Sequence, residues 1–291
     1  MNWMRYKNIY FLLSATLIAV GIFSLAKWGL RLGVDFSGGT IAEYKFDREI
    51  STEQTAEKIK ESGIDVYSIQ ETDDNTYLIK MPPVNSEDRV NIAETLNKLS
   101  ESEADELRFE TVGPSIGPEL VKKTVYAIII AAGAILVWIA YQFKNLKFGI
   151  SAILAMFHDT FILVASFALL GFFFGAEVDF LMVTAVLTTL SFSVHDTIVV
   201  YDRIREIQKK EGGDIGEVAN RAITETMVRS LNNSFTIIFM LVSLILLGGS
   251  TIVWFAVALL IGTVLGTYSS PFVAVPLLVS WDSVVKLIKK R

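Results

Sequence analysis

The sequence predicts a membrane α-helical protein: a six-span bundle with one ferredoxin-like α+β domain between spans one and two. Three observations predict this fold. The chain of 291 residues is 52% hydrophobic, above the ~45–50% that is usual in soluble proteins. Its apolar residues fall into six runs, each able to cross ~30 Å of hydrocarbon. Residues 31–121 between them are polar, with 20 acidic and 9 basic side chains, against 11 and 17 in the remainder.

The first apolar run covers residues 9–26 and follows two basic residues. It could be a signal peptide or a retained membrane helix. The small residues of a cleavage site do not follow it, whereas Lys27 and Arg31 do. We therefore expect residues 1–30 to form a cytoplasmic N-terminus and the first transmembrane helix.

Residues 31–121 are expected to form the extracytoplasmic domain. Ser51 and Gln54 have the spacing of a capping box, and Gly63 ends the helix that they begin. The predicted elements are a strand 40–46, a helix 51–61, strands 66–71 and 76–81 around a turn at 73–75, a helix 86–99 and a strand 107–112. This β-α-β-β-α-β order is the ferredoxin-like pattern. The block contains no His and no nucleophile–base pair, so we expect a binding or mechanical module and not an enzyme.

Residues 122–291 are expected to hold spans two to six and a cytoplasmic C-terminus. The five apolar runs cover 124–143, 148–172, 180–201, 231–247 and 252–279. At ~1.5 Å per residue each can span the bilayer, the run 231–247 only marginally.

Six spans place the flanking Lys and Arg residues on one side of the membrane. They occur at 5–7, 144–147, 203–229 and 286–291. Short cytoplasmic loops carry such an excess of positive charge. The sequence thus predicts a multi-pass protein of the cytoplasmic (inner) membrane with both termini inside and residues 31–121 outside. Basic residues that flank apolar runs do not form a nucleic-acid surface, and we expect no such partner.

Asp196, in the fourth span, is the main candidate functional residue. A carboxylate at mid-membrane costs ~2.5–3.5 kcal/mol on insertion scales, so it needs a partner, a water path or a function. Arg229 opens the fifth span, and we expect it at a depth similar to that of Asp196. Arg203 continues the face of Asp196 at the cytoplasmic rim, and His195 is its neighbour.

Structural interpretations of these residues remain open. Asp196 could form a fixed ion pair with Arg229 or Arg203 that only holds the bundle together. His195 could be a packing residue, and Arg229 could extend its side chain to the lipid headgroups.

His158 and Asp159 lie about ten residues into the third span and could satisfy each other locally. Two His and two Asp on two helices show no known ligand spacing, so we expect no metal. No Walker-type phosphate loop occurs, and we expect no cofactor.

The sixth span carries a packing signal. Gly262, Gly266 and Ser270 repeat every four residues and form a small-residue face for close helix contact. Pro271 and Pro276 predict a kink or break there.

Four stretches spread over the chain resemble the SecD/SecF family of protein-export membrane proteins, part of the resistance-nodulation-division superfamily. The first includes Asp35, Phe36, Gly38 and Gly39, and the second includes Asp196. They are Gly-Val-Asp-Phe-Ser-Gly-Gly-Thr at 33–40, Ser-Val-His-Asp-Thr-Ile-Val-Val-Tyr-Asp-Arg-Ile-Arg-Glu at 193–206, Arg-Ser-Leu-Asn-Asn-Ser at 229–234 and Gly-Thr-Tyr-Ser-Ser at 266–270.

The chain departs from the family pattern at two places. The family usually has Asn before the fourth-span Asp, where this chain has His195. It often has Gly-Tyr-Ser upstream, where this chain has Ser-Phe-Ser at 191–193. A His beside Asp196 could tune the proton affinity of the carboxylate.

The resemblance implies the smaller subunit of a pair that works with SecD and the SecYEG channel. Such proteins use the proton motive force to help pull the translocating polypeptide out of the membrane. The residues that would form a proton relay are Asp196, Arg229, His195, Asp159 and His158, with Arg203 at the rim.

Two other function classes remain as alternatives. One is a non-conducting subunit whose intramembrane charges only stabilise SecD and the channel. The other is half of a small-molecule or lipid exporter on the same superfamily plan. An aromatic pocket in the outside domain would favour the exporter, and proton-dependent export would favour the relay.

Overall fold

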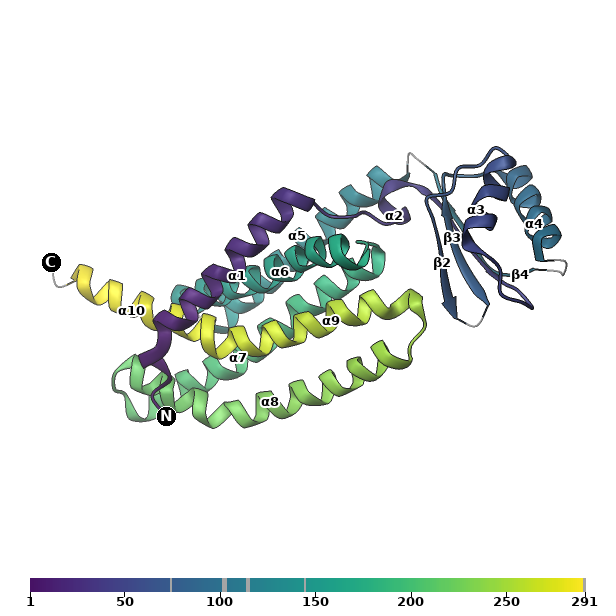
Figure 1. The fold of residues 1–291 in the computed structure, drawn as a ribbon. Helices are drawn as coiled ribbons and strands as arrows, with labels where there is room; N and C mark the ends of the chain where they lie inside the picture. Colours follow the sequence, from purple (N-terminus) through teal and green to yellow (C-terminus); the bar gives the residue numbers. More distant parts are fainter. Residues whose placement is uncertain (74, 101–103, 114–115, 144, 290–291) are drawn as a thin grey trace.

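The computed structural model describes all residues except 74, 101–103, 114–115, 144 and 290–291. Asp74 of the predicted turn 73–75, and Lys144 and Arg291 of the predicted basic segments, lie outside the described residues. An elongated helical bundle carries the α+β domain at one end (Figure 1). The first residues of the chain and helix α10 lie at the opposite end of the bundle (Figure 1).

The described chain contains six helical stretches long and apolar enough to cross a membrane, which confirms the predicted number of spans. A short 3₁₀ turn, Trp3–Tyr6, precedes the first helix. The helices are α1 (Lys7–Trp28), α5 (Ile116–Phe143), α6 (Leu146–Phe174), α7 (Phe180–Glu211), α8 (Ile215–Leu247), and α9 (Ser250–Ser269) with α10 (Val275–Lys289).

Several helices extend beyond the apolar runs. α5 begins at Ile116, eight residues before its run, and its polar first turns include the exposed Glu119–Lys123 ion pair at 2.8 Å. α8 begins at Ile215 and buries Ala219 and Ala222 before the apolar run starts. The helix over the shortest run is therefore 33 residues long, and its span is not marginal.

The polar block is a four-stranded antiparallel sheet with the strand order β2-β3-β1-β4. β3 lies between β1 and β2, which is the split arrangement of the ferredoxin-like fold, as predicted. The elements are β1 (Gly39–Lys45), α3 (Thr52–Glu61), β2 (Ser68–Asp73), β3 (Thr76–Met81), α4 (Ser86–Ser100) and β4 (Asp105–Val112). β2 begins two residues later than predicted.

One face of the sheet forms the core of the domain. Tyr44 and Tyr77 face each other across β1 and β3 and are fully buried, with Ile59 of α3 and Ile92 of α4. The Ser51 hydroxyl accepts a hydrogen bond from the Gln54 backbone N–H at 3.4 Å, so the predicted cap of α3 is confirmed. The other face of the sheet looks towards the bundle.

The sixth span is interrupted where proline predicted it. Residues Ser270–Ala274 form a π-helical turn between α9 and α10, with Pro271 in its first positions. Such turns are frequent at functional sites because they leave backbone groups unpaired and shift the helix face.

Small residues of α9 lie directly against α7. A Cβ on Gly262 would meet the Thr189 hydroxyl at 2.1 Å, and one on Gly266 would meet the Ser193 Cα at 3.2 Å. Just beyond this contact, the hydroxyls of Thr197 in α7 and Ser270 in the π-helical turn lie 3.0 Å apart.

Candidate functional site

α7 runs through the middle of the bundle, packed against α6, α8 and α9. Its inward face carries Thr189, Ser193, Asp196 and Val200, all buried. These are the positions that helical spacing places on one face. Polar residues on the buried face of a central helix must find partners on its neighbours.

Asp159 of α6 forms the first of two carboxylate centres and is fully buried. Its Oδ2 accepts hydrogen bonds from Ser193 of α7 at 2.6 Å and from Ser269 of α9 at 2.5 Å. Its Oδ1 lies 2.9 Å from Nδ1 of His158. The other ring nitrogen of His158 is buried without a partner within the described chain. Asp159 thus joins three helices just before the π-helical turn.

Asp196 of α7 forms the second centre and is 4% exposed. Its Oδ2 accepts a hydrogen bond from the Ser230 hydroxyl of α8 at 2.5 Å. Within the described residues it forms no ion pair, so neither of the two pairs considered for it, with Arg229 or Arg203, is present in this conformation. A buried carboxylate held by one neutral donor is unusual and suits its protonated form.

Arg203 and Arg229 lie instead towards the connection between α7 and α8. The Arg203 guanidinium contacts Glu206 of α7 and Glu225 of α8, both at 2.5 Å. Arg229 is exposed. Both arginines line a hollow of about 620 Å³ between α7 and α8, which also includes Asp202. We name this hollow the α7–α8 vestibule; because Arg229 directly precedes Ser230, it begins next to the Asp196 centre.

Between residues 181 and 201, the exposed side chains of α7 are all polar, and they form its outward face. His195 is exposed on this face, in line with Thr184, Thr188 and Ser191. On α8, Asn232, Asn233 and Thr236 are exposed as well. The Thr184, Thr188 and Thr236 hydroxyls bond to backbone carbonyls of their own helices, whereas His195 is of the ionisable kind that rarely faces lipid.

The predicted signature loop lies at the opposite end of α7. Asp35 is half-buried in the short helix α2 (Val34–Ser37), and its carboxylate accepts a hydrogen bond from the backbone N–H of Phe180, the first residue of α7, at 2.9 Å. Phe36 is buried. Gly38 and Gly39 have φ values of 78° and 146°, which favour glycine, and a Cβ on Gly39 would lie 2.8 Å from the Met81 carbonyl.

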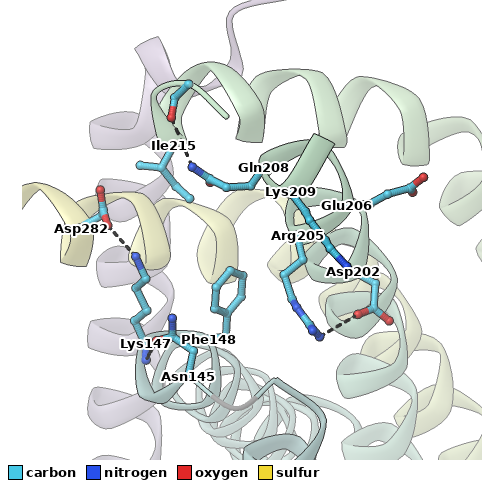
Figure 2. Close-up of a pocket in the computed structure, with 11 residues that line it drawn as sticks. Asn145, Lys147, Phe148, Asp202, Arg205, Glu206, Gln208, Lys209, Ile215 and Asp282 are labelled. Carbon is cyan, nitrogen blue, oxygen red and sulfur yellow. Dashed lines mark hydrogen bonds and ion pairs between the residues drawn. The ribbon is translucent and has the colours of Figure 1, made fainter. Parts of the chain in front are cut away.

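A larger hollow of about 860 Å³ lies between the start of α6, the end of α7 and α10 (Figure 2). Two ion pairs line it, Lys147 with Asp282 at 2.6 Å and Arg205 with Asp202 at 3.5 Å, and its other charged residues, Glu206 and Lys209, have opposite signs. Phe148 forms its floor between these pairs (Figure 2). Such a neutralised hollow does not select one ligand charge, and it lies away from the two buried carboxylates.

Three partners of the site escaped prediction from the sequence. Ser230 and Ser269 lie inside the motif stretches 229–234 and 266–270, but neither was predicted as a partner of Asp196 or Asp159. The Tyr201 hydroxyl donates a hydrogen bond to the Ala274 carbonyl in the π-helical turn at 2.8 Å and lies 2.9 Å from the Ser151 hydroxyl. The Ala274 carbonyl is free to accept this bond because of the π-helical turn, and the meeting of the turn with Tyr201 depends on tertiary packing. No local sequence pattern therefore indicates this hydrogen bond. In the described residues, no group of three or more acidic, His or Cys side chains is placed to hold a metal.

Comparisons with known proteins agree with this architecture. A family model described as protein export membrane protein SecD/SecF, C-terminal, matches residues 91–284, and a SecD/SecF GG motif model matches residues 23–50. The protein translocase subunit SecF of Thermobaculum terrenum is 40% identical over 96% of this chain and 93% of that protein. SecDF of Thermus thermophilus is 34% identical over 96% of this chain, but the chain spans only 38% of that protein.

Two solved structures are similar over nearly the whole chain. The crystal structure of SecDF from Thermus thermophilus, a translocon-associated membrane protein, has a TM-score of 0.84 and 33% identity over 97% of this chain and 39% of that chain. The crystal structure of SecDF in its super-membrane-facing form has a TM-score of 0.73 and 32% identity, and the match covers 100% of this chain and 40% of that chain. By its motifs, its fold and these relatives, the chain belongs to the SecD/SecF family of protein-export membrane proteins, as a SecF-type protein translocase subunit.

Proposed function

We propose that this subunit acts with SecD and the SecYEG channel to couple the proton motive force to export of polypeptides across the cytoplasmic membrane. Asp196 carries the proton. The relatives that join a SecD part to a SecF part in one chain support the pairing with SecD. The proposal places residues 31–121 outside the membrane and both termini in the cytoplasm.

The observation that carries the proposal is the state of Asp196. It is buried, has one neutral hydrogen-bond donor and no counter-ion in the described chain, and lies beside a vestibule that holds two arginines. Loss of a proton would leave an uncompensated charge, which a movement of Arg229 towards Asp196 would neutralise. The carboxyl therefore has two preferred arrangements that differ by one proton.

The available energy is adequate for such a switch. One charge that crosses the membrane potential yields ~2.3 kcal/mol per 100 mV. The insertion cost of one carboxylate in a membrane helix is ~2.5–3.5 kcal/mol. One proton can thus change the balance between the two arrangements of α7 and α8.

The outward polar face of α7 and α8 supports a membrane partner. His195, Ser191 and Asn233 would face hydrocarbon in an isolated subunit, at a cost that a neighbouring helix bundle removes. We assign this face to SecD. The relay proposed from the sequence would then pass from SecD through His195 and Asp196, while His158 and Asp159 hold α7 in place.

The exporter alternative lacks the feature that would favour it. Tyr44, Phe46 and Tyr77 of the α+β domain are buried in its own core. One hollow on the described surface of that domain is lined by Lys58, Glu61, Thr95 and neighbours, and a second, between its sheet and the membrane helices, has Trp254 of α9 as its aromatic lining residue.

Export into membrane vesicles tests the proposal. Asp196→Asn keeps the acceptor for Ser230 but cannot cycle its charge. We expect export in the absence of a gradient to be unchanged and its stimulation by an imposed proton gradient to be lost, at equal subunit levels. Glu211→Gln, which neutralises an exposed carboxylate at the end of the same helix, is the matched control. Full stimulation in Asp196→Asn would leave Asp196 a structural residue.

Single cysteines test the orientation, because the chain has none of its own. A cysteine at Asn75 should react with a membrane-impermeant maleimide from outside intact cells. One at Lys209 should react only after the membrane is opened. Labelling of both sites from the same side contradicts the proposed topology.

A further inference from the structure

We propose that two loop segments, 31–35 and 177–180, form a clamp that transmits movement of α7 to the extracytoplasmic domain. The inference rests on the proposed function and adds the element that links the proton-carrying helix to the domain. We call these segments, with the Lys80–Glu177 ion pair, the loop clamp. None of its residues belongs to the Asp196 centre.

Backbone hydrogen bonds join the two segments. The Gly33 N–H donates to the Val178 carbonyl at 2.9 Å, and the Val178 N–H donates to the Arg31 carbonyl at 2.7 Å. Leu32 and Val178 form a parallel bridge of a single residue pair. A short ladder of this kind fixes both the distance and the direction of the two chains.

Two side-chain contacts complete the clamp. Asp35 binds the first backbone N–H of α7 at 2.9 Å, a position where a carboxylate is favoured by the free N–H groups and the helix dipole. Lys80, on the bundle-facing side of β3, contacts Glu177 at 2.7 Å. The Lys80 side chain is only 15% exposed, so this pair is less screened than a surface pair.

The position of the clamp determines what it can transmit. α7 is continuous from Phe180 to Glu211, and Asp196 lies sixteen residues from its start, or ~24 Å along the helix at ~1.5 Å per residue. A continuous helix moves as a rod, so a tilt of α7 about the Ser193–Asp159 hydrogen bond moves both the Asp196 part of the helix and its first turn. There the helix is bound to the segment that leads directly into β1.

The surroundings of the clamp leave room for movement. A crevice of about 140 Å³ lies between the bundle-facing side of the sheet and the membrane helices, lined by Ile41 and Leu78 of the sheet and Trp254 of α9. The signature loop also contacts the start of α5, since a Cβ on Gly117 would lie 2.5 Å from the Phe36 carbonyl. The domain therefore pivots on α5 and is driven through the clamp.

Charge reversal tests the clamp with export as the first readout. Lys80→Glu places two acids together, and we expect most of the gradient-stimulated export to be lost while gradient-independent export remains. The exchange Lys80→Glu with Glu177→Lys restores the pair and should recover at least half of the stimulation. Lys58→Glu, which breaks the exposed pair with Glu61 inside the domain, is the matched control and should behave as wild type.

Asp35 provides a second and independent set of variants, should Lys80→Glu fail to accumulate. Asp35→Asn keeps an oxygen acceptor for the Phe180 N–H and should retain most of the stimulation. Asp35→Ala removes the acceptor and should lose most of it. Equal behaviour of the two would overturn the role assigned to this hydrogen bond.

A distance measurement reports the movement itself. Spin labels on cysteines at Lys98 of α4 and Leu247 at the end of α8, both highly exposed, should change separation when a gradient is imposed on vesicles that contain this subunit and SecD. We expect a shift of about 2 Å, the scale of known helix shifts, which Lys80→Glu abolishes and the exchange restores. A shift or stimulation that survives Lys80→Glu overturns the clamp alone. Absence of stimulation in wild type contradicts the proposed function and the clamp with it.

Discussion

The two buried carboxylates of the bundle differ in how completely their surroundings satisfy them. Asp159 has three hydrogen-bond partners from α6, α7 and α9 and is fully buried. Asp196 has one, Ser230 of α8, and lies one helical turn from Val199, which lines the α7–α8 vestibule. Both are in membrane helices, and both helices carry a His immediately before the Asp.

The difference separates a structural role from a mobile one. A carboxylate with several partners on three helices loses all of them when any helix moves, which favours a single arrangement. A carboxylate with one partner and a nearby arginine can exchange one arrangement for another at low cost. Under the proposed function, the number of hydrogen-bond partners, more than burial, distinguishes the residue that holds α7 from the residue that moves it.

The largest expected effect is on stability at Asp159. Asp159→Ala leaves the hydroxyls of Ser193 and Ser269 without their acceptor and should lower the free energy of unfolding by roughly 2–4 kcal/mol, since buried unpaired groups cost ~1–3 kcal/mol each and membrane hydrogen bonds average less. Thermal unfolding in detergent, followed by tryptophan fluorescence, measures it. Asp159→Asn keeps one oxygen acceptor and should lower the free energy of unfolding by less than Asp159→Ala does. A neutral effect of the alanine would remove the structural half of the comparison.

A smaller loss is expected where α9 approaches α7. Gly262→Ala places a methyl group against the Thr189 side chain, an overlap that costs ~1–3 kcal/mol when helices cannot separate freely. Thr189→Ala in the same chain should recover part of it. The same melting assay applies, and additive losses in the double variant would show that the two residues do not share one contact.

Asp196→Asn should change stability least among the intramembrane variants. The amide oxygen can still accept from Ser230, so we expect the free energy of unfolding to stay within about 1 kcal/mol of wild type. Export, by contrast, should lose its response to the gradient. A large loss of stability would place Asp196 in the same class as Asp159.

The smallest effect concerns Asp179, the N-cap of α7, outside the membrane span. Burial raises the pKa of this carboxyl, and the neighbouring Asp35 adds to the increase, against hydrogen bonds such as that from the Met182 N–H. The folded state then binds the proton more tightly than the unfolded state. The contribution of Asp179 to the free energy of unfolding is therefore largest below the ordinary carboxyl pKa and is lost as the pH rises through the raised pKa.

Asp179→Asn should accordingly unfold at a slightly higher temperature than wild type at pH 7, because Asn caps helices about as well as Asp and carries no charge. The difference should shrink as the pH is lowered to ~4. Melting curves at a series of pH values measure it. A difference that grows towards low pH would contradict the assigned cause.

Hydrophobic periodicity and charge by themselves determined most of the architecture. Six runs, the polar block and the order of its strands follow from how apolar residues must be buried in lipid or in a small core, and these constraints act on each segment alone. The motif residues Asp196 and Asp159 were evident for the same reason, since any ionisable residue in an apolar run is costly. Pro271 likewise indicated the break in the sixth span.

Only the tertiary structure decided which groups satisfy these residues. Depth along two helices suggested Arg229 for Asp196, but the rotation of α8 presents Ser230 and leaves Arg229 in the vestibule. Ser269 reaches Asp159 because Gly262 and Gly266 allow α9 close to α7, and Asp35 reaches α7 because the domain folds back onto the α6–α7 loop. A hydrogen bond depends on distances of a few tenths of an ångström between segments far apart in the chain, which no local pattern encodes.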